Sequence, residues 1–393
     1  MKTEKTFSRV LMLSALFAAV QSHADTPTHY ALPVVFDSSP EDGVVAGDFN
    51  EDGRVDLVTF EEPSRGTYGN LINYGKKVMR LQRTDTSEVA FAYKRFDRER
   101  AADAIYAGDM NGDGHLDLVA TNNFIKKYGS LDVFLGNGDG SFQPVILVQG
   151  LAQKNGDSVL ADMDGDGDLD VVMATGGAVL LNHGDATFYS QPDGAPVAIG
   201  SKPIAADVNA DGYNDLVLTN ATTAAGKFLV QLNSADGLGN LHYPRAVDSG
   251  VSNLSRVHVV DMNQDGFMDL IAFDALANQI SLVYGVGDGS FLTPSLIQVS
   301  DLNDAQGVNL VVTDANADGY GDLVVSYGVR LSSGRISDIK SDVLIQNPVT
   351  HGFAKGSEFE GTVGDKRLTA DLNNDGRDDL VSVSKFQLNN AQE

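Results

Sequence analysis

The stretch "DMDGDGDLD", residues 162–170, places five aspartates within nine residues. Carboxylates this close together repel one another, and the repulsion grows where the surroundings exclude water. The segment is therefore either a solvated acidic turn or a site where a cation lies between the carboxylates. One copy does not distinguish the two, so the rest of the chain has to be searched for others.

The acidic stretch recurs seven times along the chain. The copies are "DFNEDGRVD" from Asp48, "DMNGDGHLD" from Asp109, "DMDGDGDLD" from Asp162, "DVNADGYND" from Asp207, "DMNQDGFMD" from Asp261, "DANADGYGD" from Asp314 and "DLNNDGRDD" from Asp371. Positions 1, 5 and 9 are always Asp, position 3 is Asn or Asp, position 6 is always Gly, and position 7 varies freely. This self-similarity indicates seven copies of one structural unit.

The constant positions match the oxygen ligands of a calcium loop. Such a loop offers side-chain oxygens at positions 1, 3, 5 and 9, a backbone carbonyl at position 7, and a Gly at position 6 for the sharp turn. Oxygen donors favour Ca²⁺ over zinc or copper, and we predict up to seven Ca²⁺, one per repeat. The predicted metal-binding residues are Asp48, Asn50, Asp52, Arg54, Asp56, Asp109, Asn111, Asp113, His115, Asp117, Asp162, Asp164, Asp166, Asp168, Asp170, Asp207, Asn209, Asp211, Tyr213, Asp215, Asp261, Asn263, Asp265, Phe267, Asp269, Asp314, Asn316, Asp318, Tyr320, Asp322, Asp371, Asn373, Asp375, Arg377 and Asp379.

Two other interpretations of these loops have to be compared with the calcium loop. A single copy could be an ordinary Asp-Gly hairpin turn without metal. An EF-hand would need flanking helices and a bidentate Glu at position 12. No copy has that Glu, and the exits such as "DLVTF" and "DVVMA" are β-branched runs typical of buried strands. We therefore expect each loop to join two strands of a hairpin.

A second pattern follows each exit strand and sets the fold class. It is clearest in "LDVFLGNGDGSFQPV" from Leu131 and "ISLVYGVGDGSFLTP" from Ile280, where a third strand, a turn and a fourth strand follow one another. Four strands per repeat of about 50 residues, seven times over, predict an all-β, seven-bladed β-propeller. The alternative is an open array of small separate domains.

The two ends of the repeat array predict how the ring closes. The last repeat has about three strands, ending in "KFQLNN", whereas "HYALPVV" near the start resembles the fourth-strand segment "SFQPVIL" from Ser141. We infer that residues 30–36 supply the fourth strand of the seventh blade, so that an N-terminal strand closes the ring.

The quoted repeats resemble the FG-GAP/VCBS family, which includes the N-terminal propeller of integrin α subunits and many exported bacterial proteins. The resemblance covers essentially residues 28–390. It implies a propeller of four-stranded blades with calcium held between the first and second strands. The chain departs from integrins because all seven of its loops are acidic, where a subset is expected. Family membership of this kind implies a fold and a metal more than a function.

The first 24 residues differ in composition from the repeats. Lys2, Lys5 and Arg9 precede an apolar run that is too short to span a bilayer, and a small-x-small motif precedes Asp25. We interpret residues 1–24 as a signal peptide, with an N-terminal core helix as the alternative, and residues 25–393 as one propeller domain. The protein is then exported, to the periplasm or beyond. Beyond residue 24 the chain carries 25 Lys and Arg against 53 Asp and Glu, which argues against nucleic-acid and anionic-membrane partners, and it has no Cys for disulfides or thiolate sites.

Basic and aromatic residues stand out in the segments expected between second and third strands. If the propeller interpretation holds, these segments lie opposite the acidic loops, and they could form one ligand-binding surface for an anionic partner. The candidate ligand-binding residues are Arg65, Tyr68, Phe124, Lys126, Lys127, Tyr128, Arg330 and Arg335. The alternative is that these cations only solvate loops or pair with nearby acids.

The function predicted from these features is a binding or adhesion module for a protein or glycan, with calcium in a mainly structural role. So many carboxylates make any choice of a catalytic pair arbitrary, and no residue is assigned a catalytic role. An exported polysaccharide lyase or hydrolase on the same scaffold remains the alternative, and a purely structural assembly subunit is a third class.

Overall fold

The computed structural model describes part of the chain, and the expected signal peptide lies outside that part. The described residues are 28–30, 34–35, 43–60, 64–65, 71–73, 77–84, 89–97, 102, 104–122, 129–151, 158–173, 178–190, 202–219, 226–242, 245–251, 254–274, 277, 279–299, 305–330, 336–360, 367–382 and 385–391. Within these ranges every regular element is a β-strand, and no helix there is long and apolar enough to cross a membrane.

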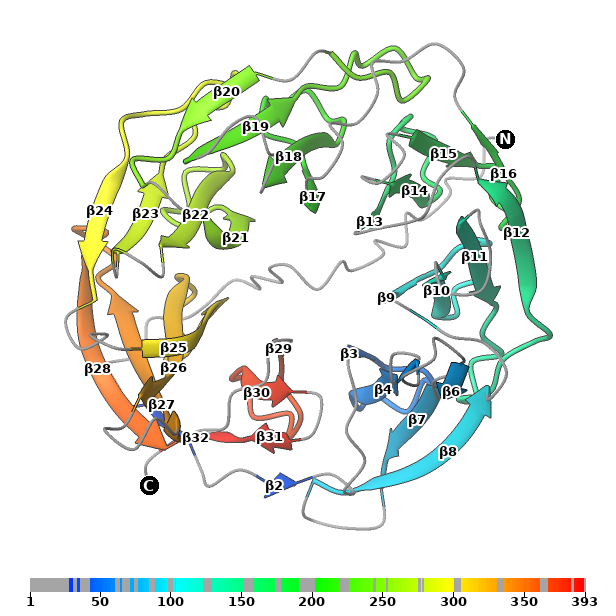
Figure 1. Ribbon diagram of the computed structural model, residues 1–393, viewed down its shortest axis with the longest axis horizontal. Coiled ribbons are helices and arrows are strands. Elements are labelled where there is room, and N and C mark those ends of the chain that lie inside the picture. Colours follow the sequence, from blue (N-terminus) through cyan, green and yellow to red (C-terminus); the bar gives the residue numbers. More distant parts are fainter. Residues whose placement is uncertain are drawn as a thin grey trace, which may run out of the picture.

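Seven four-stranded antiparallel sheets stand as blades around a ring (Figure 1). The innermost strands are β3 (Gly43–Gly47), β9 (Ala104–Gly108), β13 (Ser158–Ala161), β17 (Lys202–Ala206), β21 (Ser255–Val260), β25 (Ala305–Thr313) and β29 (Arg367–Ala370). The second strands are β4 (Asp56–Phe60), β10 (Asp117–Asn122), β14 (Asp170–Met173), β18 (Asp215–Thr219), β22 (Asp269–Asp274), β26 (Asp322–Arg330) and β30 (Asp379–Ser382). The predicted seven-bladed propeller is confirmed.

The outer half of each blade is formed by a third and a fourth strand. The third strands are β7 (Lys77–Gln82), β11 (Gly129–Phe134), β15 (Ala178–Asn182), β19 (Lys227–Gln231), β23 (Gln279–Val283), β27 (Ile336–Gln346) and β31 (Lys385–Gln387). The fourth strands of blades 1 to 6 are β8 (Phe91–Asp97), β12 (Ile146–Leu151), β16 (Phe188–Ser190), β20 (Arg245–Asp248), β24 (Ser295–Gln298) and β28 (Phe353–Glu360). Blade 1 also carries a small hairpin of β5 (Ser64–Arg65) and β6 (Leu71–Asn73) between its second and third strands.

The seventh blade takes its fourth strand from the other end of the repeat array. Its order is β2-β31-β30-β29, where β2 (Val34–Val35) pairs with β31. A second pair lies beside it, between β1 (Thr28–Tyr30) and β32 (Asn389–Ala391). The prediction that an N-terminal strand completes the last blade is confirmed, with Val34–Val35 as the described part of that strand, whereas Tyr30 belongs to the separate pair.

The hydrophobic core lies in layers between neighbouring blades. Strand β22 shows why the second strands are apolar along their whole length: Ile271 and Phe273 pack toward blade 6, whereas Leu270 and Ala272 pack toward blade 4. Successive side chains of a strand point to opposite faces, and in this strand both faces are covered. The run "DLIAF" is therefore buried without an exposed face.

Candidate metal loops on one face of the ring

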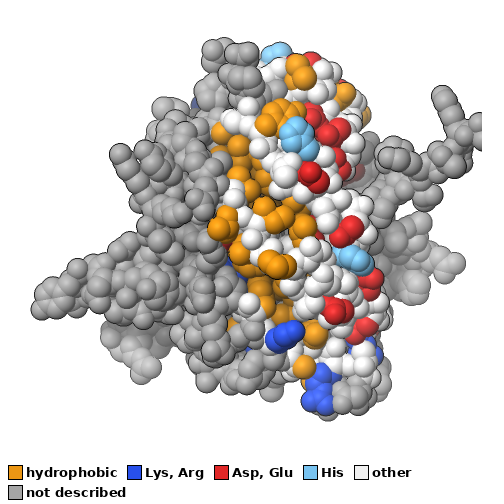
Figure 2. All heavy atoms as spheres, turned by 90° about the vertical axis from the view of Figure 1, so that its right-hand side faces the viewer, with side chains coloured by type: hydrophobic (Ala, Val, Ile, Leu, Met, Phe, Trp, Pro, Cys, Tyr) orange, Lys and Arg blue, Asp and Glu red, His pale blue; other side chains and the backbone are white. Residues whose placement is uncertain are grey.

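The seven acidic loops all lie at the same end of the blades. Each joins the first strand of its sheet to the second, and the turn between the third and fourth strands reaches the same end. Figure 2 shows acidic side chains gathered along one edge of the rim, beside a band of hydrophobic side chains. The exposed Leu147 and Tyr189 lie on the outer strands β12 and β16 of this rim. The connections from second to third strands leave the sheets at the opposite end.

The first loop shows how positions 1, 3 and 5 hold the chain. The Asp48 carboxylate accepts hydrogen bonds from the backbone N–H groups of Asp52, at 3.1 Å, and Gly53, at 2.8 Å. Asn50 Oδ1 accepts a second contact from the Asp52 N–H at 3.2 Å. Asp52 Oδ1 in turn accepts from the N–H of Arg54 at 3.0 Å. The residues expected to bind metal therefore also shape the turn.

The same hydrogen bonds recur in five further loops, and the loop of blade 3 is a variant. The recurring bond from the position 6 N–H to the position 1 carboxylate is formed by Gly114, Gly212, Gly266, Gly319 and Gly376 with Asp109, Asp207, Asp261, Asp314 and Asp371. In blade 3, Asp162 accepts from the N–H groups of Gly165, at 2.7 Å, and Gly167, at 3.0 Å. Seven loops thus share one framework.

Two positions in every loop have left-handed backbone conformations. At position 6 the seven glycines have φ between 81° and 96°, which explains why only Gly occurs there. Position 4 is also left-handed, although it is Gly in only two copies. The position 4 residues are Glu51, Gly112, Gly165, Ala210, Gln264, Ala317 and Asn374. Sequence comparison missed position 4 because its residue type varies.

The position 9 aspartates are fully buried and hold the backbone. Each is 0% exposed. One carboxylate oxygen accepts from the N–H of position 2 in the same loop, at 2.7–3.1 Å. The other accepts from an N–H at the end of the third strand, at 2.6–2.8 Å. A carboxylate has further lone pairs beyond these two bonds, so a metal-ligand role for position 9 stays a prediction.

Burial raises the pKa of every position 9 carboxyl group, and nearby carboxylates raise it further: those of positions 5 and 1 in six loops, and those of positions 3 and 1, Asp164 and Asp162, in blade 3. The backbone N–H bonds oppose this effect by favouring the ionised form. The pKa is raised to about 6 for Asp56, Asp117 and Asp215, to about 7 for Asp170, Asp269 and Asp379, and to about 8 for Asp322. In the metal-free loops, the ionised form of these carboxyl groups is therefore energetically less favourable than in water.

The loop of blade 3 offers the most direct test of whether a cation fits. One carboxylate oxygen from each of Asp162, Asp164 and Asp166 lies within 4.8 Å of the others. Oxygens bound to one Ca²⁺ at 2.3–2.6 Å are at most about 5 Å apart, so this group fits a single calcium ion. Burial, followed by the charge of Asp166, raises the pKa of Asp164 to about 6. The donor set is all oxygen, as calcium prefers.

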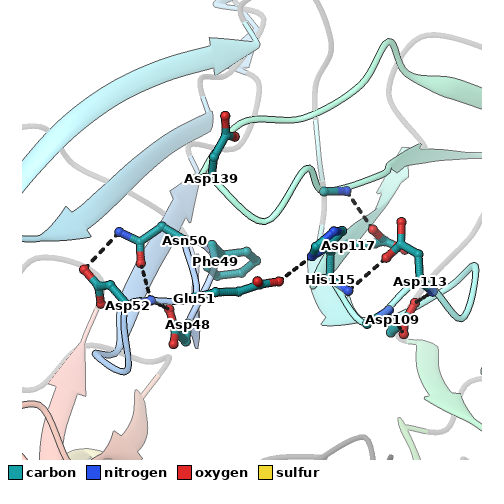
Figure 3. A network of polar contacts seen from close by, with 12 residues as sticks. Asp48, Phe49, Asn50, Glu51, Asp52, Asp109, Asp113, His115, Asp117 and Asp139 are labelled. Atoms are coloured by element: carbon teal, nitrogen blue, oxygen red, sulfur yellow. Dashed lines mark hydrogen bonds and ion pairs between the residues drawn. The ribbon is translucent and has the colours of Figure 1, made fainter.

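Neighbouring loops touch one another through position 4. Figure 3 shows Glu51 of the first loop directed across to His115, at position 7 of the second loop, with which it forms an ion pair. This hydrogen bond to Glu51 raises the pKa of His115. Asn374 Nδ2 donates to the carbonyl of Gly53 in the next loop at 3.4 Å, and Gln264 donates in the same way to Gly319. Among the described residues, position 4 therefore links neighbouring loops at three junctions, between blades 1 and 2, blades 5 and 6, and blades 7 and 1.

Most of the predicted ligand-binding surface lies outside the described residues. The backbone is described only for Arg65, which pairs with Leu71 in the small hairpin of blade 1, and for Arg330, which pairs with Ile336 between β26 and β27. Tyr68, Phe124, Lys126, Lys127, Tyr128 and Arg335 fall in segments that the structure does not describe. The strand ends that carry these segments lie opposite the acidic loops, as expected.

Comparison with solved structures finds matches at low sequence identity. A lectin of Agrocybe aegerita that recognises non-reducing terminal N-acetylglucosamine is 19% identical with a TM-score of 0.54, and the match covers 80% of each chain. A putative 6-phosphogluconolactonase of Bacteroides fragilis is 12% identical with a TM-score of 0.50, covering 82% of this chain and 85% of that one. The rhamnogalacturonan lyase YesW is 13% identical with a TM-score of 0.49, covering 94% and 76%. At such identities the likeness concerns the fold alone.

Comparison with sequences gives a narrower result. No curated protein matches the chain. The model of the FG-GAP-like repeat matches residues 109–173, 162–218, 207–272 and 261–325, which together span more than half of the 393 residues. Each match begins at position 1 of one acidic loop and runs past the next loop into its exit strand. The chain therefore belongs to the FG-GAP-like repeat family.

Proposed function

We propose that this chain is an exported, calcium-stabilised propeller that acts as a binding module for a glycan or protein ligand. The observation that carries the proposal is the sevenfold recurrence of one acidic loop framework on one face of the ring. A framework repeated in every blade suits a structural task that every blade shares. A single catalytic centre would not need seven copies.

The calcium ions would be held by the side chains of positions 1, 3 and 5, by the backbone carbonyl of position 7, and by position 9 where its remaining lone pairs allow. A bound dication supplies positive charge among carboxylates that otherwise repel one another. The residues themselves set the loop conformation and connect it to the strands. For an exported chain without Cys, calcium would serve the stabilising purpose that disulfides often serve.

The ligand surface is proposed on the connections between second and third strands, at the end opposite the acidic loops. Loops on a rigid scaffold commonly carry binding. Arg65, Lys126, Lys127 and Arg330 are basic, so their side chains would attract an anionic ligand. They are conspicuous because the chain as a whole has a net charge of −26. The lectin of similar fold recognises a glycan, and this is the only support that the comparison gives to a glycan ligand.

The test is a binding and turnover assay on one panel of acidic and neutral polysaccharides, with 1 mM CaCl₂ or with chelator. Retention of an acidic polysaccharide without released product is the expected result. Released product would establish the alternative, an exported polysaccharide lyase or hydrolase. Replacing Arg65, Lys126, Lys127 and Arg330 together by Ser should abolish retention and leave the calcium-dependent melting temperature unchanged. If this variant still retains the polysaccharide, the proposed ligand surface is wrong.

A further inference from the structure

Six of the seven acidic loops also receive a hydrogen bond from the next blade at the carbonyl of their position 2, and among the described residues the loop of blade 5, with Met262 at this position, is the exception. Four blades do this with a side-chain amide from the end of their third strand or just beyond it. The pairs are Gln82 to Leu372 O at 2.7 Å, Asn182 to Met110 O at 2.8 Å, Asn233 to Met163 O at 2.7 Å, and Asn389 to Ala315 O at 2.8 Å. The donor always belongs to the blade that follows the acceptor.

Blades 2 and 5 reach the same carbonyl with backbone instead. Gly140 N–H donates to Phe49 O at 2.9 Å, and Gly289 N–H donates to Val208 O at 3.2 Å. In these two blades the place of the amide residue is taken by Gly136 and Gly285. A Cβ there would lie 2.3 Å from a backbone carbonyl oxygen, so no side chain could occupy it. Two different solutions to one requirement indicate that the contact matters.

The amide residue is also tied to the loop of its own blade. Asn389 N–H donates to Asp379 Oδ1 at 2.6 Å, and Asp379 Oδ2 accepts from Leu372 N–H at 2.8 Å. Leu372 O in turn accepts the amide of Gln82 in the following blade. Position 2 is thus held at both its N–H and its carbonyl, once from within its blade and once from the neighbour.

Position 2 lies between two residues expected to bind metal, and its side chain is anchored. The seven side chains at this position are buried, between 0% and 3% exposed: Phe49, Met110, Met163, Val208, Met262, Ala315 and Leu372. A fixed position 2 determines where the carboxylate of position 1 and the oxygen of position 3 lie relative to each other. Interactions of this outer kind orient metal ligands, and their loss typically weakens metal binding about 10–100-fold.

We propose that Gln82, Asn182, Asn233 and Asn389 are positioning residues for the cation site of the preceding blade, so that each such site is completed by its neighbour. The inference rests on the proposed calcium function. It places the affinity of a loop under the control of a residue from another repeat, up to 290 positions away in sequence. By reciprocity, a cation in one loop stabilises the junction with the next blade.

The test uses terbium(III), an oxygen-seeking substitute for calcium whose luminescence is excited through nearby tyrosines. Tyr320 belongs to the loop of blade 6, which Asn389 contacts. Tyr189 lies near the loop of blade 3, which Asn233 contacts, and the charges of Asp164 and Asp166 help to raise the pKa of its hydroxyl. Tyr284 lies near Asp269 of the blade 5 loop and is replaced in both backgrounds. The background Tyr213→Phe/Tyr284→Phe/Tyr189→Phe follows blade 6, and Tyr213→Phe/Tyr284→Phe/Tyr320→Phe follows blade 3.

The substitutions Asn389→Leu and Asn233→Leu serve as controls for each other. We expect Asn389→Leu to weaken terbium binding about tenfold in the blade 6 background and to leave the blade 3 background unchanged. Asn233→Leu should do the reverse. Asn389→Gln, which keeps an amide as Gln82 does at its own junction, should retain at least part of the affinity. General destabilisation would affect both backgrounds alike.

The outcomes separate the inference from the function on which it rests. No tyrosine-sensitised terbium binding by the unsubstituted protein would overturn the cation sites themselves. Binding that neither Leu substitution alters, or that both alter equally in the two backgrounds, would overturn the positioning role and leave the sites standing. If one Leu variant does not fold, the other, together with Asn389→Gln, still decides between these outcomes.

Discussion

At the scale of single residues, the left-handed position 4 is where the loops can be improved. Ala210 has a φ of 58°, a conformation that costs a residue with a Cβ roughly 1–2 kcal/mol. We expect Ala210→Gly to stabilise the protein by about 0.5–1 kcal/mol, after allowing for the greater freedom of Gly in the unfolded chain. Urea unfolding in metal-free buffer measures the difference.

The matched control lies two residues further along the same loop. Gly212 has a φ of 90°, and a Cβ there would meet nothing within 4 Å. Gly212→Ala should therefore destabilise by about 1 kcal/mol through backbone strain alone. Equal effects of the two substitutions, in size and sign, would show that φ does not govern this loop.

Single residues also show what sequence could and could not predict. The repeat comparison identified the loops, the invariant Gly of position 6 and the strand that follows, because these depend on local backbone geometry within nine residues. It assigned Asp56 and its equivalents to metal, whereas the structure also shows them holding two backbone N–H groups. The residue type at this position serves both roles equally well, so sequence alone could not reveal the second.

At the scale of elements, the turn between the third and fourth strands takes two forms. In blade 2 it begins at Gly136, where a Cβ would lie 2.3 Å from the carbonyl oxygen of Leu116. Backbone cannot move aside as a flexible side chain can, so Gly136→Ala should lower stability by more than about 1 kcal/mol. Thermal unfolding of the variant in 1 mM CaCl₂ measures this loss.

A glycine in the corresponding turn of blade 6 provides the comparison. At Gly352 a Cβ would make only an ordinary contact, at 3.5 Å from Thr350 Oγ1, and Gly352 itself does not have a left-handed φ, although the preceding His351 does. Gly352→Ala should be neutral or slightly stabilising. If both alanines were tolerated, the close approach at Gly136 would have no energetic consequence.

The junction between blades 5 and 6 differs from those with a side-chain amide bond. Gln346 donates its backbone N–H to Asp322, but its buried side-chain amide has no hydrogen-bond partner among the described residues. Replacing an unsatisfied buried amide by an apolar group of similar shape is nearly neutral or stabilising. We expect Gln346→Met to leave the urea midpoint unchanged or raise it.

The corresponding residue of blade 3 should respond in the opposite way. Asn182 is 2% exposed and donates to both Met110 O and Leu169 O. Asn182→Leu leaves those carbonyls unsatisfied, which costs about 1–3 kcal/mol. A loss on Gln346→Met as large as that on Asn182→Leu would mean that the blade 6 amide is satisfied in solution.

The amide contacts were not predictable from the repeats, for a reason that also lies in the elements. The residue that bonds to position 9 follows it by 10 positions in blade 7 and by 26 in blade 1, because the intervening connections differ in length. It is Gln, Asn or Gly according to the blade. A contact with variable spacing and variable residue type leaves no constant pattern, although it occupies one place in the folded ring.

At the scale of the whole molecule, removing calcium should loosen every blade at once. With a dissociation constant of about 0.1 mM, one site in 1 mM Ca²⁺ stabilises the folded state by about 1.4 kcal/mol. Seven such sites together rival the stability of a typical domain. We expect chelation to lower the melting temperature, and the metal-free protein to unfold in one cooperative transition. A melting temperature that is the same with 1 mM CaCl₂ and with chelator would contradict the structural role of the metal.

The same sites make the stability of the metal-free ring depend on pH. The seven position 9 carboxyl groups have folded pKa values of about 6 to about 8, against 3.8 as the ordinary value. Between pH 4 and 8 the folded protein therefore holds more protons than the unfolded chain, and the free energy of unfolding falls as the pH rises. The pKa of His115 is also raised, so the stabilisation that its protonated form provides is likewise lost as the pH rises.

We therefore expect the metal-free protein to melt at a higher temperature at pH 5 than at pH 8, and calcium to reduce this difference. A dication favours the ionised carboxylates, so its stabilising effect should be larger at pH 8, where they are charged, than at pH 5, where protons already neutralise several of them. Melting curves in chelator-treated buffers at both pH values, with and without 1 mM CaCl₂, measure all four states. A metal-free protein that instead gains stability from pH 5 to pH 8 would show that the buried carboxylates are not the charges that strain the ring.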